Sequence, residues 1–187
     1  MPPKVKVTKE EIINAAIQLV RTAGVQSVNA RTVSSLLNCS TQPIFSNFTT
    51  MDDLHIAVIQ KAGDLYNAYI ENEIRSGDYP TYKATGMAYI RFAKEERELF
   101  KLLYMRDRLS EPFPKELDMD DQIENILHNA TGLDGDAAKL FHLEMWAYVH
   151  GIATMFATGY FDPEWELVSK MLTDAYQGLR KQYQMEE

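Results

Sequence analysis

The sequence predicts an all-α protein, and three observations support this fold class. Apolar residues recur at intervals of three and four, few segments alternate between apolar and polar residues, and capping residues precede the periodic segments. We expect about nine helices. Residues 1–50 should form a three-helix module with a helix-turn-helix, and residues 51–187 an antiparallel helical bundle.

The first helix should begin after Thr8 and end at Gly24. Thr8 and Glu11 have the spacing of a capping box, in which each side chain accepts a hydrogen bond from the backbone N–H of the other residue. Gly24 can adopt the positive φ that is common just after a helix. A second helix should follow the N-cap Asn29 and end at Asn38, which tolerates the left-handed conformation.

A third, short helix is expected over residues 41–48. Pro43 is compatible with it because the first turn leaves backbone N–H groups without intrahelical partners. Ile44, Phe45 and Phe48 supply its apolar side. The turn between the second and third helices is short, so the pair predicts a helix-turn-helix braced by the first helix.

Thr50 and Asp53 repeat the capping-box spacing before a long fourth helix that should reach Gly77. Acidic residues in its first turn suit the helix dipole. Asp162 and Pro163 are expected to cap the last helix. The other expected elements are helices over 80–92, 95–106, 116–130, 136–160 and 163–183, and a Pro-containing loop over 109–115.

The composition fits a globular protein of a reducing compartment. One Cys excludes a disulfide framework, no apolar run approaches the roughly 20 residues of a membrane span, and residues 1–11 lack the apolar stretch of a signal peptide. We therefore expect a cytoplasmic protein without a membrane partner. The net charge is −8, but residues 1–50 carry five basic and two acidic residues, which leaves −11 on the remainder.

The third helix would be the recognition helix of the helix-turn-helix, because the DNA major groove is wide enough to hold an α-helix. Gln42 could pair with an adenine edge through two hydrogen bonds. Uncharged residues suit this role, since phosphates supply affinity and base edges supply specificity. The residues expected to face outward are Thr41, Gln42, Pro43, Ser46 and Asn47.

Residues 8–65 resemble the N-terminal domain of a TetR family transcriptional regulator. The matching pieces are an Ile- and Ala-rich first helix ending in AGVQSV, then NARTVSSLLNCS, then TQPIFSNFTTMDDL. In the body, WAYVHG (146–151) is similar to the Trp…His-Gly signature of one class of TetR ligand-binding domains. The resemblance implies an all-α homodimer that binds DNA and a small-molecule effector.

Three positions depart from the family pattern. Phe45, Asn47 and Met51 stand where the family commonly has a Tyr, a His and a Lys that contact phosphate. We expect weaker, more salt-sensitive or more cooperative DNA binding than is usual in the family. Phosphate contacts would then come from backbone N–H groups at helix starts and from Lys4, Lys6, Lys9, Arg31, Asn47 and Thr50. The predicted DNA-binding residues are Arg31, Ser40, Thr41, Gln42, Pro43, Phe45, Ser46, Asn47 and Thr50.

Trp146 and His150 are four residues apart on one expected helix, in a region rich in Met and aromatic residues. They predict an apolar effector pocket with a few polar anchors, and the alternative for each residue is ordinary core. The predicted ligand-binding residues are Tyr66, Tyr69, Phe100, Tyr104, His142, Met145, Trp146, Val149 and His150.

No catalytic or metal-binding pattern competes with this interpretation. The pairs Glu124/His128 and His142/Glu144 lack the spacing or the Cys partners of a metal site, and no nucleophile elbow or Gly-rich phosphate loop is present. Cys39 is expected to be a small buried residue. The segment 118–124 is expected to be a solvated acidic face. We therefore predict no enzyme activity, no metal and no cofactor.

We predict that the protein is a ligand-responsive transcriptional regulator. It should act as a repressor that an effector releases from a palindromic double-stranded DNA operator. The effector should be largely apolar. The homodimer should form through the last two helices, because the helix over 136–160 is apolar around most of its girth. The alternative is a helical small-molecule-binding or protein-interaction adaptor whose degenerate helix-turn-helix does not read DNA.

Overall fold

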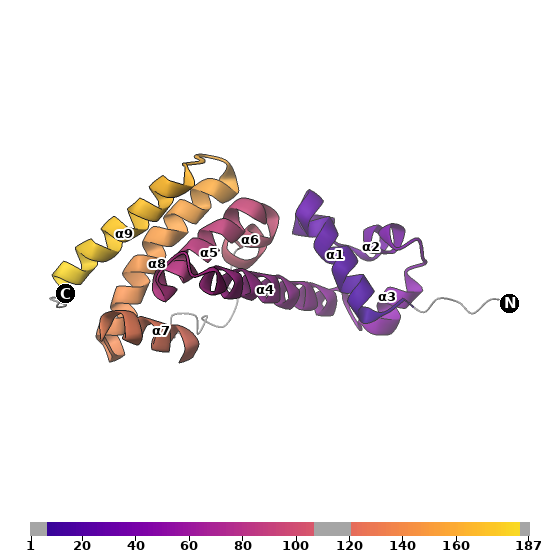
Figure 1. The fold of residues 1–187 in the computed structure, drawn as a ribbon. Helices are drawn as coiled ribbons and strands as arrows, with labels where there is room; N and C mark the ends of the chain where they lie inside the picture. The colour runs from indigo at the N-terminus through magenta and orange to yellow at the C-terminus, as the bar shows by residue number, and fades with distance from the viewer. Residues whose placement is uncertain (1–6, 107–120, 184–187) are drawn as a thin grey trace. The chain divides into compact units, whose positions relative to one another are not determined.

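The computed structural model describes residues 7–106 and 121–183, and all regular structure in these residues is helical (Figure 1). The predicted all-α class is confirmed, with nine α-helices in the described ranges. The chain divides into two compact units. Unit 1 comprises Met1–Leu65 and Glu96–Arg106, and unit 2 comprises Tyr66–Glu95 and Asp107–Glu187. The functional boundary expected at residue 50 stays a prediction.

Unit 1 contains the predicted three-helix module. Its helices are α1 (Lys9–Ala23), α2 (Ala30–Leu36), α3 (Gln42–Asn47), the first part of α4 (Met51–Ser76) and α6 (Arg97–Tyr104), with a 3-10 turn at Val25–Ser27. The capping boxes at Thr8 and Thr50 are both present, and Asn29 caps α2. These local signals depend on side chains three residues apart, which is why the sequence predicted them correctly.

The core of unit 1 is formed by the apolar side of each helix. Arg21 of α1 also pairs with Glu96 through two hydrogen bonds of 2.6 and 2.8 Å. This ion pair ties the end of α1 to the residue that precedes α6. The fully buried side chains that hold α1 to α4 together are Ile12, Ala16, Val20, Val33, Ile44, Leu54 and Val58.

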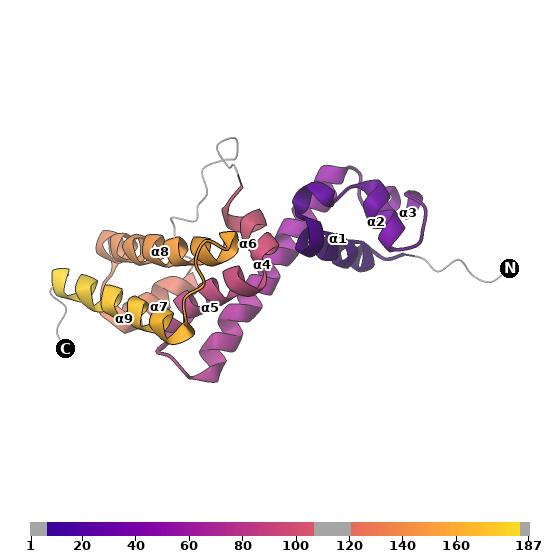
Figure 2. The same ribbon diagram turned by 90° about the horizontal axis from the view of Figure 1, so that it is seen from above.

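Unit 2 contains the second part of α4, together with α5 (Thr81–Glu95), α7 (Asp121–Thr131), α8 (Gly135–Thr158) and α9 (Trp165–Gln182). Helix α5 is its centre, because it packs against α7, α8 and α9. Helices α8 and α9 run antiparallel beside each other (Figures 1 and 2). Gly86 allows α5 to lie close to both α8 and α9. A Cβ at Gly86 would lie 3.1 Å from Leu172 of α9 and 3.4 Å from Val149 of α8.

The start of the last helix corrects one expectation. Helix α9 begins at Trp165, its N-cap is Glu164, and no side chain donates or accepts a capping hydrogen bond there. Asp162 instead pairs with Lys94 of α5 at 2.6 Å, and Pro163 is buried. A long-range ion pair therefore takes the place of the local cap. The loop expected over 109–115 and the start of the helix expected over 116–130 lie outside the described residues.

None of the helices in the described ranges combines the length and the apolar character that a bilayer span requires.

Candidate functional site

The helix-turn-helix is built by α2, a tight turn and α3. Asn38 adopts a φ of 50°, as expected for the residue that interrupts the second helix. The backbone N–H of Cys39 then bonds to the carbonyl of Ser34 at 3.0 Å, which closes the turn. Cys39 itself is partly exposed, so the expectation of a buried residue was wrong. The turn brings α3 directly after α2 with no further backbone element between them.

Helix α3 separates into a buried and an exposed side. Ile44 is fully buried and Phe48, just after the helix, is nearly so. Gln42, Phe45 and Ser46 are exposed, and Phe45 has 52% of its surface accessible. The hydroxyl of Ser46 donates to the Gln42 carbonyl at 2.9 Å, which leaves its oxygen able to accept. The exposed side is therefore uncharged and offers an amide, a hydroxyl and an aromatic ring.

Asn47 does not face outward as expected. Its Nδ2 donates to the carbonyls of Pro43 at 2.8 Å and Val7 at 3.4 Å, and the residue is partly buried. The side chain therefore connects α3 to the segment that precedes α1. Because its amide donor is used inside the protein, Asn47 is a bracing residue in this structure, and a phosphate contact would require the side chain to move.

The other predicted DNA-binding residues lie in or near α2 and α3, and all belong to unit 1. Arg31, Ser40 and Thr50 are exposed, whereas Thr41 and Pro43 are partly buried. Thr41 precedes α3 without forming a side-chain cap. Lys9 is exposed and lies over the ring of Phe48 at 5.1 Å. Lys4 and Lys6 are outside the described residues.

Unit 1 also has a hollow that sequence reasoning missed. It has a volume of about 350 Å³ and is lined by residues from the start of α1, the end of α3 and the first part of α4. No sequence signal could have found it, because its walls come from segments that are far apart in the chain. Its lining residues are Lys9, Asn47, Phe48, Thr49, Asp53, Ile56, Ala57 and Gln60.

Unit 2 contains a continuous array of aromatic and His side chains. The hydroxyl of Tyr89 lies 2.9 Å from Nδ1 of His150, and Trp146 stacks on the His150 ring with centroids 4.9 Å apart and planes 18° apart. Tyr66 meets Tyr89 edge-on at 5.7 Å. Burial lowers the pKa of His150. The array joins α4, α5 and α8, and Trp146, with 40% of its surface accessible, forms its exposed end.

A second Tyr–His pair repeats this arrangement two helical turns earlier. The hydroxyl of Tyr82 lies 3.0 Å from Nδ1 of His142, and burial raises the pKa of Tyr82 well above its ordinary value. Tyr82 and Tyr89 were not predicted as site residues. The two tyrosines are seven residues apart on α5, and His142 and His150 are eight residues apart on α8. This similar spacing was the sequence signal that could have indicated two Tyr–His pairs.

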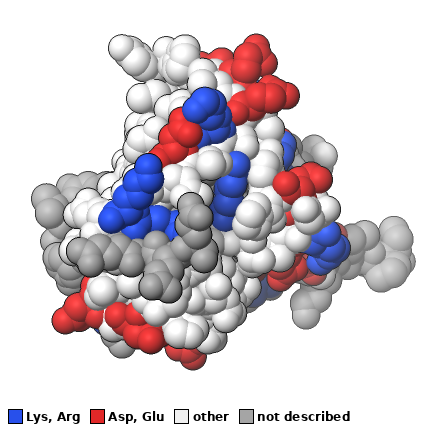
Figure 3. All heavy atoms as spheres, turned by 60° about the vertical axis from the view of Figure 1, so that its left-hand side comes forward, with Lys and Arg blue, Asp and Glu red and all other residues white. Residues whose placement is uncertain are grey.

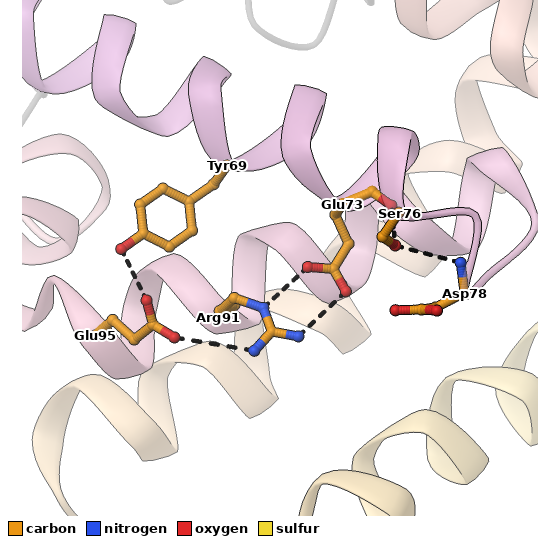
Figure 4. Close-up of polar contacts among 6 residues, drawn as sticks. All are labelled: Tyr69, Glu73, Ser76, Asp78, Arg91 and Glu95. Atoms are coloured by element: carbon orange, nitrogen blue, oxygen red, sulfur yellow. Dashed lines mark hydrogen bonds and ion pairs between the residues drawn. The ribbon is translucent and has the colours of Figure 1, made fainter.

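The remaining predicted ligand-binding residues are divided between the two units. Met145 and Val149 are buried in unit 2. Tyr69 of α4 donates a hydrogen bond to Glu95 at 2.9 Å, next to the Glu73–Arg91 ion pair (Figure 4). Phe100 and Tyr104 belong to unit 1, where their rings lie 5.2 Å apart. The other seven of the nine predicted ligand-binding residues belong to unit 2.

Charged side chains pair both with near neighbours in the sequence and with distant residues. Basic and acidic side chains are interspersed over the face of the molecule drawn in Figure 3. His128, which the sequence placed near Glu124, instead pairs with Asp134 at 2.8 Å. Among the described residues, no three side chains of His, Cys, Asp and Glu are grouped so that they could hold a metal ion.

One face of α8 is exposed although it is apolar. Leu140, Leu143 and Met155 are 37–51% exposed, and the small residues Ala147 and Gly151 lie between them on the same side. A Cβ added at Gly151 would meet nothing within 4 Å. Gly in a helix interior costs about 1 kcal/mol relative to Ala. A small residue on an exposed apolar face is therefore consistent with a close contact to another helix.

Comparisons with known proteins agree with this fold. Residues 82–175, half of the chain, match the family model described as tetracyclin repressor-like, C-terminal domain. No curated protein is significantly similar in sequence. A TetR-like transcriptional regulator from Rhodococcus sp. RHA1 is similar in structure, with a TM-score of 0.67 and 16% identity over 96% of this chain and 98% of that one.

Two further solved structures are similar. A member of the TetR family from Streptomyces coelicolor A3 has a TM-score of 0.64 and 19% identity over 89% of this chain and 96% of that one. The multidrug binding protein EbrR, complexed with imidazole, has a TM-score of 0.62 and 18% identity over 89% of this chain and 88% of that one. With the match to half of the chain, the helix-turn-helix and the helical unit 2, the chain belongs to the TetR family of ligand-responsive transcriptional regulators.

Proposed function

We propose that this protein is a homodimeric repressor that a small-molecule effector releases from a palindromic operator. The observation that carries the proposal is the surface of α3, on which Gln42, Phe45 and Ser46 are exposed while Ile44 anchors the helix in the core. These exposed groups can read base edges in a major groove, and the exposed Arg31 at the start of α2 can contact phosphate.

The proposed dimer forms through α8 and α9. Two copies of the exposed apolar face of α8 would cover each other, and α9 contributes a further exposed apolar residue, Leu167, which is 46% exposed. A dimer presents two copies of α3. Bound to consecutive major grooves, these would be about 34–36 Å apart, which is why we expect a palindromic operator.

The proposed effector site is the aromatic array of unit 2. Trp146 is exposed and offers a flat apolar surface, while His150 and Tyr89 offer polar groups beside it. Since burial favours neutral His150, the array suits a largely apolar effector with few polar groups. EbrR, one of the structurally similar proteins, is a multidrug binding protein, which is compatible with such a site.

Release would occur because the effector favours a dimer state in which the two copies of α3 are wrongly spaced. Helix α4 is the proposed connection, because its residues belong partly to unit 1 and partly to unit 2. Tyr66 and Tyr69, in its second part, contact aromatic residues of α5. An effector that shifts these tyrosines would act on the same helix that enters the DNA-binding unit.

The test is a salt titration of DNA binding by two variants. Met51 starts α4 where the family commonly has a Lys, so Met51→Lys adds one cation per protomer. Each neutralised phosphate contributes about −0.9 to the slope of log affinity against log salt, so the slope should steepen by roughly 2 per dimer. Affinity should rise equally for specific and scrambled duplexes, because phosphate contacts carry no base information.

Gln42→Ala is the matched control for base reading. The salt slope should stay the same, while discrimination between the operator and a scrambled duplex falls by about 1–3 kcal/mol if one adenine is read by two hydrogen bonds. The operator would first be selected from a random DNA pool. No binding to any duplex at low salt by either the parent or the Met51→Lys variant would refute the proposed function.

A further inference from the structure

Phe45 carries the exposed aromatic ring of the helix-turn-helix. It has 52% of its surface accessible, although it directly follows the fully buried Ile44 on α3. Among the described residues of unit 1, four large apolar side chains are exposed, and Phe45 is the only aromatic one of them. Phe48, three residues later, is 4% exposed and has Lys9 over its ring. The two Phe residues therefore differ in role, since Phe48 packs inside the module and Phe45 is presented to a partner.

The packing of α3 keeps the Phe45 ring outside the core. Ile44 and Phe48 fill the buried side of the helix, and the backbone N–H of Phe48 bonds to the Ile44 carbonyl at 2.9 Å. Asn47 Nδ2 donates to the Val7 carbonyl at 3.4 Å, which ties α3 to the segment before α1. A rotation that buried Phe45 would expose Ile44 and break these contacts. The exposed ring is therefore fixed by the folded module.

The chemistry of a Phe ring limits what it can recognise on DNA. The ring has no hydrogen-bond donor, so it cannot bond to a phosphate. In the major groove, the base edges carry hydrogen-bonding groups and one apolar group, the C5-methyl of thymine. Against other edges the ring would cover donors and acceptors without bonding to them, which costs free energy. Contact with the thymine methyl instead removes two apolar surfaces from water.

Gln42 places this contact within the operator. It is exposed and lies three residues before Phe45 on α3. Residues at this spacing share one side of a helix, with Cβ atoms about 5–6 Å apart. Base pairs follow each other at about 3.4 Å, so the two side chains reach positions no more than about two base pairs apart. An adenine read by Gln42 should therefore have the thymine read by Phe45 at the same or a neighbouring base pair.

We propose that Phe45 is a specificity-determining residue that reads the C5-methyl group of one thymine in each half of the operator. The proposal rests on the proposed function, because it requires α3 to lie in a major groove. Phe45 stands where the family commonly has a Tyr that contacts phosphate. The missing hydroxyl thus exchanges a contact without base information for an apolar contact that discriminates between bases.

The experiment removes single methyl groups from the DNA and leaves the protein unchanged. The operator is selected from a random DNA pool, and each of its thymines is then replaced by deoxyuridine, which lacks only the C5-methyl. At one position the replacement should weaken binding about fourfold in one half-site and roughly 15-fold in both, as expected for the loss of one buried methyl per protomer. This factor should be the same at low and high salt, because no phosphate contact changes.

A second probe adds the methyl group to another base. At the same position, cytosine and 5-methylcytosine present the same hydrogen-bonding groups and differ only in the methyl. The duplex with 5-methylcytosine should be bound about fourfold more tightly per half-site. A preference for unmethylated cytosine would contradict a contact between the ring and this methyl.

Two protein variants assign the methyl contact to its residue. Phe45→Ala should bind the thymine and deoxyuridine operators equally and keep the salt slope of the parent, whereas Gln42→Ala should retain the preference for thymine. Circular dichroism would confirm that both variants are folded. The proposal is overturned, and the proposed function stands, if a specific operator is bound but no thymine in it is sensitive to deoxyuridine, or if Phe45→Ala keeps the sensitivity of the parent. No binding to any duplex would overturn both.

Discussion

Arg91→Ala should destabilise the protein much more than Glu73→Ala, although both substitutions remove the same ion pair. Arg91 Nε lies 2.9 Å and Nη2 3.2 Å from the Glu73 carboxylate (Figure 4). Its guanidinium also stacks on Trp165 at 4.5 Å, and Nη1 lies 3.9 Å from Glu95. Arg91 therefore connects α4, α5 and α9.

The asymmetry follows from burial. The Glu73 side chain is 8% exposed and that of Arg91 is 35% exposed. Arg91→Ala leaves an uncompensated buried carboxylate, which costs about 3–5 kcal/mol, and removes a cation–π contact of roughly 0.5–1 kcal/mol. Glu73→Ala leaves a guanidinium that water can reach and that keeps Trp165 and Glu95, so we expect about 1–2 kcal/mol. The difference between the two variants should be about 2.5–4 kcal/mol.

Urea unfolding followed by circular dichroism, at one fixed protein concentration, measures both free energies. The exposed pair Glu71–Arg75 is the control. Its side chains are 67% and 73% exposed and 3.9 Å apart, so Arg75→Ala should cost less than about 0.5 kcal/mol. Replacing Glu73 by Leu and Arg91 by Met together should recover much of the stability lost in Arg91→Ala. Equal costs for the two single Ala variants would refute the reasoning.

The remaining predictions concern the proposed dimer, the effector site, pH and packing. Gly151→Leu should lower dimer affinity at least about tenfold in sedimentation, although helix propensity alone would stabilise the helix by about 1 kcal/mol; an unchanged dimer places Gly151 outside the interface. Trp146→Ala should weaken the effector response while DNA affinity without effector is kept, and an unchanged response in a folded variant contradicts the site assignment. Because the pKa of His150 is lowered, the unfolded chain binds more protons as pH falls below 6.5, so stability should decrease there and less so in His150→Gln. Gly86→Leu should cost about 1–3 kcal/mol in urea unfolding, since Leu172 and Val149 already lie close, and no loss would mean that α5, α8 and α9 adjust freely.

The sequence by itself determined the helical class and most helix boundaries. Thr8, Asn29 and Thr50 cap helices through contacts with residues two or three positions ahead, and Asn38 adopts its positive φ within one turn. Such interactions depend on local chain geometry, so residue type and spacing are sufficient to predict them. The short uncharged α3 has no side-chain cap, and it was identified instead from Pro43 in its first turn and from its apolar residues.

Only the tertiary structure decided which polar groups meet. Asp162 was expected to cap the last helix but pairs with Lys94, which is 68 residues away. Asn47 was expected to face DNA but bonds to the carbonyl of Val7, 40 residues earlier. Tyr89 was not expected in the site and lies against His150. A side chain chooses among all partners that folding brings within about 3 Å, and helix periodicity identifies the face on which it lies but not the residue that the neighbouring helix places opposite it.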